Sequence, residues 1–277
     1  MSLEDSFDAD VPRRRSAAIL AFDIETIPDV ELGRRLYDVA DLPDEDVARL
    51  MFFKQQQARQ TDFLPLPMQR IVAISGVLRT ADDIHIFTLG ADGEPESEIL
   101  RRFFDGLERT RPDLVSWNGC SFDLPVLHYR CLKHGINAAR YWETGDNDSS
   151  FRFNNYMNRF HWRHIDLMDV LSGYQGSGRA SLELVAQLCG LPGKLGMSGD
   201  RVWETWCRGD LASICNYCET DVLNTYLVYL RFQLIRGLYD RARIDAETAH
   251  LEAKLEHAGK PHLSEFLAAW RSGRGID

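Results

Sequence analysis

Two acidic residues interrupt an apolar stretch near the beginning of the sequence. Asp23 and Glu25 stand two residues apart, and alternate side chains of a strand share one face. Two like charges side by side on a buried strand repel each other and resist desolvation. Such a pair persists where a cation lies between the charges, and Mg²⁺ or Mn²⁺ is the natural candidate because hard cations prefer carboxylate oxygen. The alternative is that the strand ends at Phe22 and both acids lie in solvent.

Two further patterns place acids beside expected elements. Asp123 follows an expected strand and a Gly turn, close to the carboxyl end of that strand, where ligands of α/β sheets gather. Alternatively, Asp123 is only an acid favoured by the helix dipole. Tyr217 and Asp221 stand four residues apart in an expected helix, so they share one face and can hold a water molecule between them. Surface pairs of this kind are common, so this pattern is weak when taken alone.

The surrounding sequence predicts the elements that must position these side chains. Apolar runs predict strands, and longer amphipathic stretches predict helices. Strands are expected at 17–24, 71–78, 84–89 and 112–117, with an extended piece at 164–171. Helices are expected at 43–60, 97–109, 124–134, 181–188 and 211–238, followed by a final helix to Trp270. Three strands followed by alternating strands and helices predict a mixed α/β sheet covered by helices, with 43–60 as an insertion.

Composition narrows the classes of protein. The 277 residues include 42 acids and 32 bases, which gives a net charge of −10. This charge weighs against a protein that binds duplex DNA independently of sequence. It does not weigh against an enzyme that binds phosphates through bound cations. No apolar run approaches the roughly 18 residues of a membrane span. The acidic first ten residues are not a secretory signal, and six scattered cysteines suit a reduced protein, so a cytoplasmic location is expected.

Taken in order, Asp-x-Glu, Asn-x-x-x-Phe-Asp and Tyr-x-x-x-Asp resemble the DEDD, or DnaQ-like, superfamily of 3′–5′ exonucleases in its tyrosine subtype. The residues at these motifs are similar to those of the proofreading exonuclease of family B DNA polymerases. The sequence is more similar still to a stand-alone bacterial group that is predicted to be family-B-polymerase-like exonucleases. Proteins of that group share stretches such as 194–202 and 217–230. The resemblance implies a ribonuclease-H-like fold, a five-stranded mixed sheet with helices on both sides. We expect a polar arm at 1–16, the exonuclease domain at 17–237 and a helical extension at 238–277.

The resemblance also implies a mechanism. Four carboxylates, those of Asp23, Glu25, Asp123 and Asp221, would hold two divalent cations, Mg²⁺ or Mn²⁺, and Tyr217 would position the attacking water. The expected reaction releases nucleoside 5′-monophosphates from the 3′ end of single-stranded DNA. The same chemistry on RNA is an alternative, because the choice depends on a group that meets the 2′-hydroxyl. A non-catalytic nucleic-acid-binding module is a second alternative.

Further side chains are candidates for contact with the substrate. In the superfamily, groups after the first acid pair meet the 3′ end, which implicates Ile24 and Thr26, although Thr26 is equally typical of a strand. Asn118 resembles the asparagine that approaches the terminal nucleotide, or it is a turn residue. Phe122 is either a stacking wedge or a core residue. Lys194 either reaches a phosphate or is an ordinary surface lysine.

The segment 149–164 is unusual in an acidic protein. It contains no acids, three arginines including Arg159, and five aromatic residues. Arginine interleaved with aromatics suits single-stranded nucleic acid, and a packed loop is the alternative. Nearby, Asp166 and Asp169 are expected to make structural hydrogen bonds, and the Cys215-x-x-Cys218 pair to be small helix residues rather than a zinc site.

Overall fold

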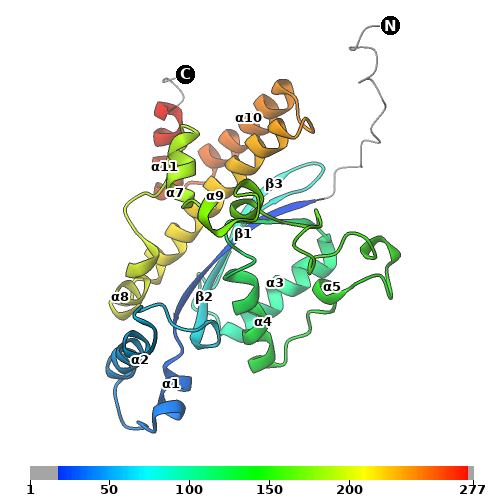
Figure 1. Ribbon diagram of the computed structural model, residues 1–277. Helices are drawn as coiled ribbons and strands as arrows, with labels where there is room; N and C mark the ends of the chain where they lie inside the picture. The colour runs from blue at the N-terminus through cyan, green and yellow to red at the C-terminus, as the bar shows by residue number, and fades with distance from the viewer. Residues whose placement is uncertain (1–17, 274–277) are drawn as a thin grey trace, which may run out of the picture.

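A mixed sheet of five strands forms the centre of the molecule (Figure 1). The computed structural model describes residues 18–273, so the arm predicted at 1–16 lies outside the described residues. The strands follow the order β3-β2-β1-β4-β5 across the sheet. Their bounds are β1 Ile19–Pro28, β2 Gln69–Arg79, β3 Ile84–Leu89, β4 Asp113–Ser116 and β5 His164–Asp166. The predicted five-stranded mixed sheet is confirmed.

The central strand β1 has partners of both directions. It pairs antiparallel with β2 and parallel with β4; β2 then pairs antiparallel with β3, and β4 parallel with β5. Its side chains alternate between two hydrophobic cores. Leu20, Phe22 and Ile24 enter one core, while Ile19 and Ala21 enter the other. The odd-numbered residues that continue β1 therefore emerge on the face that Ile19 and Ala21 define.

Helices cover both faces of the sheet (Figure 1). On one face, α3 and α4 pack over Leu20 and Phe22. On the other face, α9 lies against β1 and β2, with α7, α10 and α11 around it. The helices are α1 Val30–Tyr37, α2 Asp44–Arg59, α3 Glu96–Thr110, α4 Asp123–His134, α5 Ala139–Trp142, α6 Leu167–Leu171, α7 Leu182–Leu188, α8 Val202–Cys207, α9 Leu211–Ile235, α10 Arg241–His257 and α11 Pro261–Gly273.

The longest helix, α9, is the one that matters most for the site. Asp210 caps its first turn by accepting a hydrogen bond from the Ser213 amide. From Ile214 to Gln233 nearly every residue is buried, as expected for a helix enclosed by a sheet and other helices. Among the helices of residues 18–273, none has the length and apolar character needed to cross a membrane.

Three local predictions need correction. The extended piece expected at 164–171 ends at Asp166, because the Asp166 carboxylate accepts the Met168 and Asp169 amides and so caps α6. The single final helix is two helices, α10 and α11, because Gly259 has a φ of 65° and a proline follows at 261. The insertion after β1 contains α1 as well as the predicted α2.

Candidate active site

The first acid pair lies on the face of β1 that meets α9. Strand β1 continues to Pro28, so the alternative in which it ends at Phe22 is wrong. Asp23 is half-buried, and Glu25 is buried with 7% of its surface exposed. Because the two residues continue the alternation of Ile19 and Ala21, both carboxylates point toward α9.

Helix α9 brings the third motif to these carboxylates. Tyr217 and Asp221 share one face of α9, the Tyr217 side chain lowers the pKa of the Asp221 carboxyl, and both residues are buried, with 6% and 8% of their surfaces exposed. They are therefore not the surface pair that the sequence left open. Cys218 lies between them along the helix, and its Sγ is 3.6 Å from Oδ2 of Asp23. Ligand atoms of Asp23, Glu25 and Cys218 lie within 4.8 Å of one another.

Asp123 joins the cluster from the opposite side of β1. It is the first residue of α4, as the helix-dipole interpretation required, but it also accepts a hydrogen bond from the Ile24 amide, with 3.2 Å between N and Oδ1. The preceding loop is held close to β4, since a Cβ at Gly119 would lie 2.2 Å from the Ser116 hydroxyl oxygen. Asp166 fixes the same loop by accepting the Asn118 and Cys120 amides, in agreement with the structural role expected for it.

The electrostatics of the cluster disfavour four free negative charges. Burial raises the pKa of both Asp23 and Glu25 well above the ordinary value, and the charges of the other acids raise it further. Burial also raises the pKa of Asp123 to about 7 and that of Asp221 to about 6. The folded chain therefore holds four carboxylates that repel one another, which is the condition under which a bound cation stabilises a site.

The donor set fits a hard divalent cation. Oδ1 of Asp221 is buried and has no hydrogen-bond partner within residues 18–273, so this oxygen is free to act as a ligand. All four carboxylates offer the oxygen ligands that Mg²⁺ and Mn²⁺ prefer. The thiol of Cys218 is a soft donor, which hard cations do not prefer, and burial and the charges of Asp23 and Glu25 raise its pKa.

Lys194 is a site residue whose role the sequence leaves open. It is exposed, as a surface lysine would be, yet its Nζ lies 5.6 Å from the centre of the Tyr217 ring. Its charge lowers the pKa of Asp23, Glu25 and Asp221. Nothing in its local sequence distinguishes it from other surface lysines, since its position depends on how the loop before α8 packs against α9.

Two of the candidates for substrate contact lie on β1 itself. The Ile24 side chain is buried in the core beneath α3 and α4, and its amide donates to the Asp123 carboxylate. Thr26 is half-buried, and its hydroxyl donates to Oε1 of Gln69 over 2.9 Å. Contact of either residue with a substrate stays a prediction.

The loop before α4 carries two more candidates. Asn118 has a φ of 67°, a backbone conformation that asparagine tolerates, which explains its place in the turn. Its Oδ1 is also buried without a hydrogen-bond partner in the described part of the chain. Phe122 is half-buried and packs against the exposed ring of Phe63 at a centroid distance of 5.7 Å. Phe122 thus lies between the core and the surface, beside Asp123.

Arg159 lies along a chain of contacts that leads away from this loop. Its guanidinium pairs with Asp169 at 2.7 Å. Arg179 pairs with the other oxygen of Asp169 at 2.7 Å and reaches the Ser121 hydroxyl at 3.4 Å. Ser121 is two residues before Asp123. The structure therefore connects Arg159 to the site through Asp169 and Arg179, and no local sequence pattern indicates Arg179.

The aromatic residues around Arg159 divide into two groups. Phe151 and Tyr156 are core residues, and the Arg163 guanidinium stacks 3.8 Å above the Phe151 ring. The other aromatic side chains of the segment are exposed: Phe153, Phe160 and Trp162. The segment is thus partly the packed loop that was the alternative and partly an exposed aromatic surface.

The sheet, its covering helices and the acids that meet above β1 define the ribonuclease-H-like exonuclease fold. Residues 61–270 match the family of predicted 3′–5′ exonucleases related to the exonuclease domain of PolB, and the chain belongs to this family. The resemblance to DEDD exonucleases, and to the family-B-like group among them, is confirmed. Exonuclease domains of this kind use divalent metal ions, in agreement with the donor set. The matched range begins after Asp23 and Glu25 and runs through most of α11.

Two curated relatives are DNA polymerases. The DNA polymerase of Archaeoglobus fulgidus is 27% identical over 161 residues, which are 57% of this chain and 19% of the polymerase. The catalytic subunit of DNA polymerase epsilon from Dictyostelium discoideum is 25% identical over 140 residues, which are 50% of this chain and 6% of that protein. The similarity therefore concerns a small part of each polymerase.

Proposed function

We propose that this protein is a 3′–5′ exonuclease that releases nucleoside 5′-monophosphates from the 3′ end of single-stranded DNA, with two divalent cations, Mg²⁺ or Mn²⁺. The observation that carries the proposal is the convergence of Asp23, Glu25, Asp123 and Asp221, with Tyr217 buried on the same face of α9 as the last of them. When bound, the cations would activate water for attack and stabilise the leaving oxygen.

The residues around the carboxylates have separate roles in this mechanism. Burial raises the pKa of Tyr217, so its hydroxyl stays protonated and donates its hydrogen to Asp221. The lone pairs of that hydroxyl then accept a hydrogen bond from the attacking water and orient its oxygen toward the phosphorus. Lys194 holds a positive charge beside the same ring and stabilises the negative charge that develops on the phosphate.

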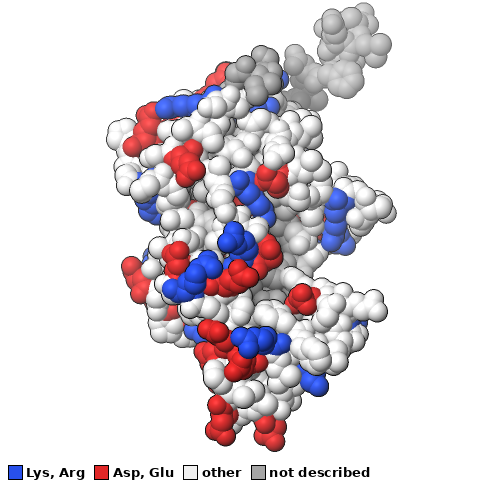
Figure 2. Space-filling model, turned by 90° about the vertical axis from the view of Figure 1, so that its left-hand side faces the viewer, with Lys and Arg blue, Asp and Glu red and all other residues white. Residues whose placement is uncertain are grey.

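The aromatic surface supports a single strand as the substrate. Unpaired bases stack on exposed rings, and Phe153 and Phe160 offer such rings on a segment without acids. The charges on the face shown in Figure 2 do not form a basic track, because Lys and Arg side chains lie among Asp and Glu side chains there. Because the net charge is −10, the protein binds single-stranded DNA weakly and in a salt-sensitive way. Weak binding favours distributive digestion.

DNA is favoured over RNA because the relatives that the chain resembles are DNA polymerases. The test is digestion of 5′-labelled single-stranded DNA with Mn²⁺, Mg²⁺ or EDTA, with Asp221→Asn as the control because it keeps the side-chain shape without the charge. We expect a ladder that shortens from the 3′ end and that is absent in EDTA and in the variant. Faster digestion of an RNA of the same sequence would assign the activity to RNA. Tight binding without turnover would support a binding module instead.

A further inference from the structure

A second buried carboxylate lies on α9 between the residues of the candidate site. Glu219 has only 2% of its surface exposed and accepts three side-chain hydrogen bonds. Thr88 of β3 donates from its hydroxyl at 2.7 Å, Lys260 donates from Nζ at 2.6 Å, and Nε2 of His262 lies at 2.7 Å. Lys260 immediately precedes α11, and His262 is in its first turn. The C-terminal helix is therefore attached to α9 at the turn that carries Tyr217 and Asp221.

A row of polar side chains continues from Glu219 across the sheet to Asp23. In the strand register Asp23 is paired with Ser75, and Ser75 with Thr88. The hydroxyl oxygens of Ser75 and Thr88 are 2.8 Å apart, and the Cys218 thiol of α9 lies 3.6 Å from Oδ2 of Asp23. Because a carboxylate only accepts, the Thr88 hydrogen points to Glu219 and the Thr88 oxygen accepts from Ser75. Hydrogen bonds thus run from the start of α11 through Glu219 and Thr88 to Ser75, which is the strand partner of Asp23.

Helix α11 also borders the space beside the catalytic tyrosine of the proposed mechanism. A cavity of about 280 Å³ lies between α9, the loop before α8 and α11. Its lining includes Tyr217 and Thr220 of α9 and His262 and Glu265 of α11. The helix that holds Glu219 therefore forms one wall of the space next to Tyr217.

We propose that Lys260 and His262 are positioning residues for the candidate metal site, which they hold in shape through Glu219. The inference rests on the proposed function, since it concerns the binding of cations by that site. Asp23 and Glu25 belong to β1, whereas Asp221 belongs to α9, so the spacing of these two elements sets the distance between the ligands. Repulsion among the acids pushes the two elements apart. The hydrogen bonds on Glu219 oppose this push by joining α9, β3 and α11.

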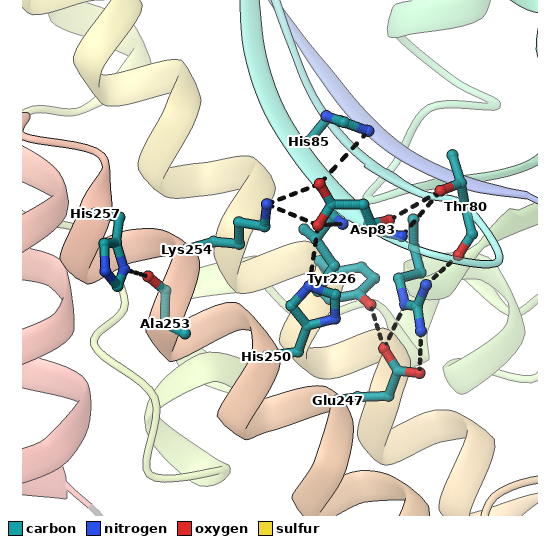
Figure 3. A network of polar contacts seen from close by, with 11 residues as sticks. Thr80, Asp83, His85, Tyr226, Glu247, His250, Ala253, Lys254 and His257 are labelled. Carbon is teal, nitrogen blue, oxygen red and sulfur yellow. Dashed lines mark hydrogen bonds and ion pairs between the residues drawn. The ribbon is translucent and has the colours of Figure 1, made fainter.

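The same C-terminal segment offers a matched control of identical residue types. His250 and Lys254 of α10 bind the Asp83 carboxylate in the turn between β2 and β3 (Figure 3), at 3.0 Å and 2.8 Å. As at Glu219, a lysine and a histidine thus attach a C-terminal helix to the rest of the chain through one carboxylate. In this case the carboxylate is not on α9, and no residue of the candidate site contacts it in the described chain.

The experiment compares the double variants Lys260→Met/His262→Gln and His250→Gln/Lys254→Met in the full chain. Binding of Mn²⁺ is measured by electron paramagnetic resonance of the free ion, alongside melting temperature and the Mn²⁺ dependence of DNA digestion. We expect the first variant to bind Mn²⁺ about tenfold more weakly than the wild type, the scale typical of residues that orient metal ligands. The second variant should lose less stability, because the Asp83 carboxylate is partly exposed to solvent, and it should keep its Mn²⁺ affinity within about twofold, because it touches none of the ligands.

The outcomes separate this inference from the proposed function. Wild-type protein that binds no Mn²⁺ would overturn both. Wild-type binding with equal affinity in Lys260→Met/His262→Gln would overturn only the positioning role, and so would an equal weakening in both double variants, since that is general destabilisation. If the first double variant does not fold, each single variant leaves Glu219 with Thr88 and one of its two C-terminal donors, and at least one of these single variants must weaken Mn²⁺ binding. Lys260→Arg, which keeps a donor and a charge, should restore it.

Discussion

At the scale of single residues, the candidate site contains a thiol among its carboxylates. Sγ of Cys218 lies 3.5 Å from the carbonyl oxygen of Asp23 and 3.6 Å from its Oδ2. Burial raises the pKa of this thiol, so it is a weak hydrogen-bond donor to Asp23 in the folded chain. The thiol thus helps to orient Asp23 and leaves coordination to oxygen, which suits Mg²⁺ or Mn²⁺.

The role of Tyr217 is testable at the same scale with Tyr217→Phe, which removes the hydroxyl and keeps the ring. We expect kcat for single-stranded DNA to fall roughly 100-fold, because the attacking water loses the group that orients it. Binding of Mn²⁺ should be unchanged, since the four carboxylates remain. The matched control is Tyr226→Phe, also on α9, whose hydroxyl lies 3.4 Å from Glu247. That change should cost about 1 kcal/mol of stability and leave kcat unaltered. Full activity of Tyr217→Phe would remove this residue from the mechanism.

At the scale of elements, the sequence predicted the helices and strands that are determined by residues close to them in the chain. Strand β1 follows from the apolar run before Asp23, and α4 ends at Gly135 as its sequence indicated. The gathering of Asp23, Glu25, Asp123 and Asp221 was expected from three local patterns, each with an alternative of its own, only when they were taken in order and compared with the DEDD exonucleases.

Elements that depend on distant contacts could not be predicted in this way. The turn to α6 depends on the Asp166 carboxylate, which also binds the loop at Asn118. The position of Lys194 depends on the packing of its loop over Tyr217, and the contact of Cys218 with Asp23 depends on the rotation of α9 against β1. Sequence periodicity reports which face of a helix is buried, and it does not report what that face meets.

The exposed aromatic segment gives a prediction for one element. Phe160 has 65% of its surface exposed, and its ring lies 4.9 Å from that of Tyr174, with Arg159 beside both. We expect Phe160→Ala to raise KM for single-stranded DNA roughly tenfold with little change in kcat, because base stacking is lost equally in the ground and transition states. The control is Phe53→Ala on α2, where a ring that is 57% exposed lies outside the segment. An equal KM in wild type and Phe160→Ala would show that the single-stranded DNA does not contact Phe160.

At the scale of the whole molecule, a buried charge network ties the helices of one layer to the sheet. Arg130 of α4 is 1% exposed and pairs with Asp29 at 2.6 Å and with Glu96 of α3 at 2.5 Å. Glu96 also accepts the Ile71 amide of β2, and Asp29 caps α1. One guanidinium thus links α1, α3, α4 and β2. Removal of any partner leaves a buried charge uncompensated, which is strongly destabilising.

This network makes the fold sensitive to acid. Burial alone would raise the pKa of Asp29, but hydrogen bonds from Lys133, Arg130 and the Leu32 amide outweigh it and lower the pKa to about 2. A carboxylate with a lowered folded-state pKa stabilises the fold above its unfolded pKa, and the contribution disappears as the pH falls through the folded value. From pH 7 to pH 3, the stability difference between wild type and Asp29→Asn should therefore shrink by about 1 kcal/mol, roughly half of the total. Urea unfolding at both pH values measures this difference, and the same difference at pH 3 as at pH 7 would show that Asp29 is not ionised in the network.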